Sequence, residues 1–113
     1  MKIQVSTDKS IEGSADLIER TEADLADALA RFERRVTRIE VHLRDESAGR
    51  STGGDIGCLI EARPAGLDPV AVTHHADTVS DALRGATDRL EALLSSRLER
   101  LEGHGSRETI RGR

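Results

Sequence analysis

The sequence contains no Trp and no Tyr, and its single Phe is Phe32. A hydrophobic core must therefore be built almost entirely from aliphatic side chains. The lack of aromatic rings also removes the platforms on which single-stranded nucleic-acid binders stack successive bases. Composition alone thus counts against binding of that kind.

Cysteine is also scarce, because Cys58 is the one cysteine of the chain. An internal disulfide framework is excluded, and the count suits a reducing cytosol. Cys58 alternates with Ile56 and Ile60 in a pattern typical of a strand, so we expect a buried and inert thiol rather than a nucleophile.

No apolar run approaches the roughly 20 residues that a membrane-spanning helix needs. The first residues alternate between polar and apolar side chains, unlike a signal peptide. Both observations predict a cytoplasmic protein without membrane contact.

The chain also lacks a surplus of basic residues. It has 17 Lys and Arg against 21 Asp and Glu, a net charge of −4, whereas nucleic-acid binders are usually basic.

The chain of 113 residues is long enough for one domain with a modest core. Apolar and polar residues alternate in four segments, which predicts strands. Two further segments repeat apolar residues every three or four positions, which predicts amphipathic helices. The predicted strands span 2–7, 34–45, 55–63 and 69–76, and the predicted helices span 15–32 and 77–101.

This order, strand, helix, three strands, helix, predicts an α+β fold in which two helices cover one face of a four-stranded sheet. Short connections between the last three strands favour an antiparallel meander. We expect Ser14 and Asp77 to cap the two helices, Gly103 to end the second, and residues 46–54 to form a loop. The domain would span 1–102, followed by a flexible tail over 103–113.

No motif in the sequence indicates catalysis or a bound metal. His74 and His75 are adjacent on a predicted strand, so their side chains point to opposite faces and cannot share an ion. The Ser-Thr-Gly-Gly segment at 51–54 lacks the lysine and the helix of a phosphate-binding loop. We expect no enzyme activity, no cofactor and no metal site.

Several short segments resemble the ribosome hibernation promoting factor and ribosome-associated inhibitor (protein Y) family, which includes the sigma-54 modulation and ribosomal subunit interface proteins. They are Ser10-Ile11-Glu12, the helix ending at Phe32, Ile39-Glu40-Val41-His42-Leu43, and Asp88-Arg89-Leu90-Glu91-Ala92-Leu93-Leu94. The last is similar to the family's D-[KR]-L-E-x-x-L run. The resemblance covers roughly residues 1–101.

The resemblance implies a two-layer fold similar to double-stranded-RNA-binding domains. It also implies a ribosome-associated factor that binds 16S rRNA in the decoding channel of the 30S subunit and inhibits translation under stress. Arginines of the second helix and of residues 31–50, where six Arg face four acids, would meet the phosphates. The expected RNA-binding residues are Arg31, Arg34, Arg35, Arg38, Arg44, Arg84, Arg89, Arg97 and Arg100.

The sequence departs from this family on the first helix, where Asp24 and Asp27 stand at positions at which the family carries basic residues. This motivates an alternative: a diverged member that acts as a protein-interaction module without binding ribosomes. An apolar overhang of the last helix formed by Leu94, Leu98 and Leu101 would then pair two subunits in a homodimer.

Overall fold

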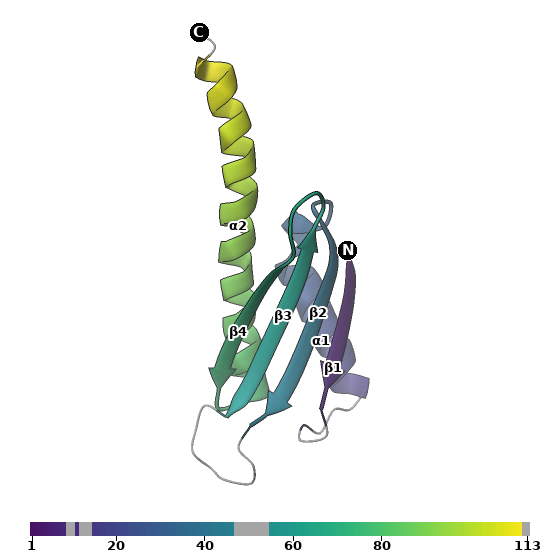
Figure 1. The fold of residues 1–113 in the computed structure, drawn as a ribbon. Coiled ribbons are helices and arrows are strands. Elements are labelled where there is room, and N and C mark those ends of the chain that lie inside the picture. The colour runs from purple at the N-terminus through teal and green to yellow at the C-terminus, as the bar shows by residue number, and fades with distance from the viewer. Residues whose placement is uncertain (9–10, 12–14, 47–54, 112–113) are drawn as a thin grey trace.

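The computed structural model describes residues 1–8, 11, 15–46 and 55–111, the last eleven of them by their backbone alone. Within this part of the chain, a four-stranded sheet forms one layer and two helices lie against one of its faces (Figure 1). The predicted α+β sandwich is therefore confirmed. The predicted cap Ser14 and the segment 51–54 lie outside the described residues.

The sheet has the order β1-β2-β3-β4, with β1 at Lys2–Thr7, β2 at Val36–Asp45, β3 at Ile56–Pro64 and β4 at Val70–Ala76. β1 runs parallel to β2, and the other neighbours are antiparallel. The predicted meander of the last three strands is confirmed. α1 and its connections carry the chain between the parallel pair, as parallel strands require.

Alternation along β2 separates the two faces of the sheet. Ile39, Val41 and Leu43 are at most 2% exposed and face the helices. The register shifts between Val36 and Arg38, and this irregularity lets Val36 face the core three positions before Ile39. In the described part of the chain no helix covers the opposite face of the sheet (Figure 1). Most of its side chains are polar, with Leu59 and Ala71 as exceptions.

The first helix is shorter than predicted. α1 spans Ala15–Ala28, and a separate 3₁₀ turn, η1, spans Ala30–Phe32. The N–H of Phe32 donates to the carbonyl of Leu29, a three-residue spacing that tightens the chain. This turn places Phe32 in the core, at 5% exposure, and moves the start of the next strand to Val36.

The second helix, α2, spans Val79–Arg111 and crosses behind β3 and β4 (Figure 1). Its buried residues recur every fourth position and form one ridge: Ala82, Ala86, Leu90, Leu94 and Leu98. The N-cap is Thr78 rather than the predicted Asp77, because the Thr78 hydroxyl accepts from the N–H of Asp81 at 3.1 Å.

Two predictions about the end of α2 need correction. Leu94 and Leu98 are 0% and 7% exposed within the single chain, so they belong to the core and not to an apolar overhang. The side chain of Leu101 lies outside the described part of the structure, and the homodimer stays a prediction. The helix also continues to Arg111, ten residues past the predicted end, and runs through Gly103. Glycine lowers helix propensity but does not stop a helix that is already formed. The division into a domain over 1–102 and a tail stays a prediction.

No helix in the described part of the chain combines the length and the apolar character needed to cross a membrane.

Candidate nucleic-acid interface

The outer face of α2 carries three exposed arginines: Arg89, Arg97 and Arg100. At 3.6 residues per turn they lie within about a quarter turn of one another. Arg89 and Arg97 make no ion pair with any described residue, and Arg100 contacts the Ser96 hydroxyl at 3.4 Å. These guanidinium groups form a stripe that is available to an anionic partner.

The side of α2 that faces α1 has a different charge. A groove of about 260 Å³ lies between the two helices, and Arg84 lines it together with Asp24, Asp88 and Glu91. Since three carboxylates surround one guanidinium, Arg84 belongs to an acidic environment. The structure therefore separates Arg84 from the outer arginine stripe.

α1 itself presents an acidic surface. Its exposed charged residues are Asp16, Glu19, Arg20, Asp24 and Asp27. A continuous positive strip over both helices is therefore absent from the described surface. The acids at Asp24 and Asp27 lie beside the groove and would repel phosphates that approach from that side.

Arg31 bridges η1 and α2. Its Nη2 donates to the Ser95 hydroxyl at 2.8 Å and lies 4.0 Å from the Glu91 carboxylate, while its guanidinium stacks over the Phe32 ring at 4.5 Å. Arg31 thus helps to fix the turn after α1 to the second helix. Its side chain remains 60% exposed.

The remaining predicted arginines are spread along β2 and the turn before it. Arg34 is exposed and Arg35 is half-buried, and both belong to the turn that leads into β2. Arg38 and Arg44 lie at opposite ends of β2 on the open face of the sheet. Arg38 donates to Gln4 at 2.9 Å and to Glu40 at 3.2 Å, and Arg44 lies 3.5 Å from Asp8.

Strand register brings the predicted Arg38 together with two cations, Lys2 and Arg63, that were not among the predicted RNA-binding residues. Lys2 of β1 is the partner of Arg38, and Arg38 is the partner of Arg63 of β3. Strand alternation places each of these residues on the polar face, but only the pairing of strands distant in the chain aligns them. We call Lys2, Arg38 and Arg63 the cation row.

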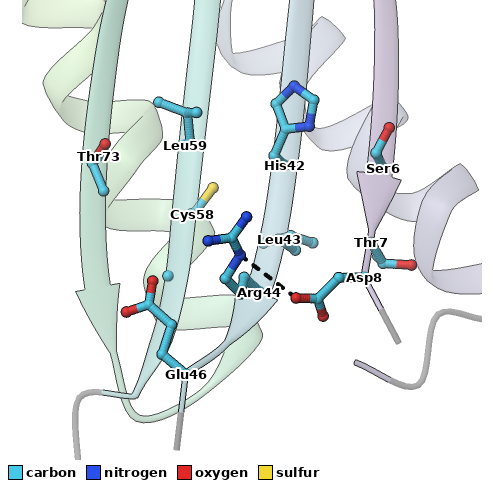
Figure 2. A pocket seen from close by; sticks show the side chains of 11 residues that line it. Ser6, Thr7, Asp8, His42, Leu43, Arg44, Glu46, Cys58, Leu59 and Thr73 are labelled. Carbon is cyan, nitrogen blue, oxygen red and sulfur yellow. Dashed lines mark ion pairs between the residues drawn. The ribbon is translucent and has the colours of Figure 1, made fainter. Parts of the chain in front are cut away.

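At the other end of the open face is a polar hollow of about 310 Å³ (Figure 2). Arg44, Asp8 and Glu46 line it, with His42 further along β2. The hollow holds charges of both signs, and Glu46 also pairs with His75 at 3.1 Å. His42 and His75 share this face but lie in different cross-strand rows, since His42 pairs with Leu59 and His75 with Gly57.

Among the described residues, no side chains form an arrangement typical of catalysis or of metal binding. No group of three or more His, Cys, Asp or Glu side chains comes together there in a way that could hold a metal ion. Cys58 is fully buried, and this burial raises the pKa of its thiol to about 12. The burial of this thiol expected from the sequence is therefore confirmed.

The fold places the chain in a known structural class of two-layer α+β sandwiches. The crystal structure of the Thermus thermophilus protein Y N-terminal domain is similar, with a TM-score of 0.67 and 22% identity over 85% of this chain and 98% of that one. A ribosomal subunit interface protein from Coxiella burnetii gives a TM-score of 0.59 and 19% identity over 86% and 97%. No protein-family model and no curated protein matches the sequence.

These similarities establish that the chain has the protein Y fold. They extend over nearly all of both known structures, which supports the fold that the sequence resemblance implied. Of the segments that carried that resemblance, Ile11 is buried in the core, while Ser10 and Glu12 lie outside the described residues.

Proposed function

We propose that this chain is a ribosome hibernation factor of the protein Y type that binds the small ribosomal subunit and blocks its decoding channel. The observation that carries the proposal is the outer arginine stripe of α2, exposed and free of carboxylate partners among the described residues, on a protein Y fold. Its partner would be 16S rRNA of the 30S subunit, and its location the cytoplasm.

The proposed mechanism requires no catalytic group and no cofactor. Each guanidinium that neutralises a phosphate releases condensed counterions, so affinity depends steeply on salt. The rigid sheet and α2 would then occupy space that messenger RNA and transfer RNAs need. Inhibition follows from steric exclusion alone.

The acidic α1 changes how the protein would approach RNA. In this chain α2 supplies the positive surface and α1 supplies repulsion, so the phosphates would lie against the outer side of α2. Arg31 and the Arg34–Arg35 turn are close in sequence to η1 and would extend the contact, whereas Arg84 would not take part.

Co-sedimentation with purified 30S subunits tests the proposal. We expect the wild-type protein to move with the subunits at low salt and to dissociate as salt rises. The triple variant R89Q/R97Q/R100Q should bind more weakly, with a log–log salt slope reduced by about 1 for each lost phosphate contact. The variant R20Q, which removes an exposed arginine from α1, is the matched control and should keep the wild-type slope.

Wild-type protein that stays at the top of the gradient at low salt would overturn ribosome binding. A triple variant with an unchanged slope would instead show that the outer stripe is not the contact surface.

A second candidate function is a protein-interaction module without ribosome binding, which the acidic surface of α1 favours. Because like charges repel, the acids of α1 would have to contact the arginine stripe of a second copy. Light scattering over a range of concentrations should then reveal self-association that either D24N/D27N or R89Q/R97Q/R100Q abolishes. A monomer at every concentration argues against a homodimer.

A further inference from the structure

The open face of the sheet concentrates like charges in the cation row defined above. Lys2, Arg38 and Arg63 are direct neighbours on three adjacent strands. Like charges directly opposite one another destabilise a strand pair. Three cations in one row therefore have no structural benefit for the sheet.

The neighbouring carboxylates neutralise only the middle of the row. Glu40 binds the Nη2 atom of Arg38 at 3.2 Å, and Gln4 binds the same atom at 2.9 Å. The Nε atom of Arg38 is buried and has no hydrogen-bond partner among the described residues. Arg38 is thus held in place through Nη2, while its side chain as a whole is 42% exposed.

The two ends of the row are open. Lys2 and Arg63 are exposed, and no carboxylate of the described residues lies within ion-pair distance of either side chain. With neighbouring strands about 4.8 Å apart, the row extends about 10 Å across the sheet. A row of this length can face more than one phosphate of an RNA strand.

We propose that Lys2, Arg38 and Arg63 form a second RNA-phosphate site, on the sheet face opposite to the helices. The inference rests on the proposed function, because it takes RNA to be the partner. It extends that function: the outer stripe of α2 and the cation row lie in different layers of the molecule (Figure 1), so the protein would lie between two RNA segments. Arg38 orients the site, and Lys2 and Arg63 supply unpaired charge.

Binding of a short, fluorescein-labelled RNA duplex of mixed sequence, measured by anisotropy at several salt concentrations, tests this site. We expect R63Q to reduce the log–log salt slope by about 1 and K2Q/R63Q by about 2. R20Q removes one exposed arginine from α1 and should leave the slope unchanged. Arg38 is kept, because its loss would leave Gln4 and Glu40 without their partner.

A separate site should act independently of α2. In the R89Q/R97Q/R100Q background, R63Q should therefore cause the same further fold-loss of affinity as in the wild type, since distant sites contribute additively. Circular dichroism of R63Q should match the wild type, because the Thr37 hydroxyl donates to the backbone carbonyl of Arg63, which the substitution retains.

The outcomes separate this inference from the proposed function. If R89Q/R97Q/R100Q lowers the salt slope while R63Q behaves like R20Q, the cation row is not a phosphate site but ribosome binding through α2 stands. If R63Q lowers the slope and the α2 variant does not, the sheet face is the RNA surface and the outer stripe is not. Wild-type protein that fails to bind the duplex at low salt overturns the cation row as an RNA site.

Discussion

Among single residues, Cys58 shows how the environment of a side chain determines its chemistry. The thiol faces the helices from β3, is 0% exposed, and has its pKa raised to about 12 by burial. Only the thiolate is a nucleophile. Burial therefore blocks both the ionisation of the thiol and the access of reagents.

We predict that Cys58 of the folded protein does not react with an aromatic disulfide reagent at pH 8, whereas the unfolded chain reacts fully. Because the folded pKa is raised, this group stabilises the fold below the unfolded pKa of about 9, and that contribution is lost as pH rises towards about 12. Absorbance at 412 nm with and without guanidinium measures the reactivity. Rapid labelling of the folded protein would contradict this burial.

The strength of a surface ion pair also depends on the exposure of the two residues that form it. The Arg31–Glu91 pair is long, at 4.0 Å, and its side chains are 60% and 31% exposed. Such exposed pairs contribute about 0–1 kcal/mol. A phosphate could therefore replace Glu91 at little cost, so this ion pair does not remove Arg31 from an RNA surface.

Among the elements, the contact between β4 and α2 depends on a residue without a side chain. Gly85 faces the ring of His74, and a Cβ at this position would collide with the ring atoms Cδ2, Nε2 and Cγ. Helix propensity alone favours alanine over glycine by about 1 kcal/mol. The close approach of strand and helix reverses that preference.

We predict that G85A lowers the free energy of unfolding by about 1–3 kcal/mol, because the added methyl group overpacks the interface. In the H74A background, G85A should cost much less stability than in the wild type. The reason is that the added methyl group collides with the His74 ring, which H74A removes. Urea unfolding of the wild type and the three variants gives the coupling energy. A G85A variant as stable as the wild type would show that the His74 ring moves aside freely.

For the whole molecule, the length of α2 exceeds what the sheet can cover. Leu98 is the last buried residue among the described side chains of α2, while the helix backbone continues to Arg111 and extends past the sheet (Figure 1). An isolated helical end gains little stability without tertiary contacts. We therefore expect the core of the molecule to be independent of the last turns of this helix.

We predict that a chain ending at Glu102 unfolds within about 0.5 kcal/mol of the full chain, because it retains the whole buried ridge. Thermal unfolding followed by circular dichroism checks this. A chain ending at Leu93, which lacks Leu94 and Leu98, is the contrasting variant and should lose several kcal/mol, as buried leucine truncations do. Equal loss in both chains would place part of the core beyond residue 102.

Local patterns in the sequence determined most of the architecture. Alternation identified the polar and core faces of β2, and a four-residue repeat identified the ridge of α2, because a side chain's face follows from its own φ/ψ class. The 3₁₀ turn at Ala30–Phe32 was missed, since its three-residue spacing also fits the apolar pattern of a continuous helix.

Only the tertiary structure decided how charges from distant segments combine. It sorted the predicted arginines into the outer stripe of α2, the acidic groove at Arg84 and the scattered positions along β2, and it aligned Lys2 with Arg38 and Arg63. It also buried Leu94 and Leu98. The physical reason is that strand register and helix placement are set by contacts between residues far apart in the chain, which no local period encodes.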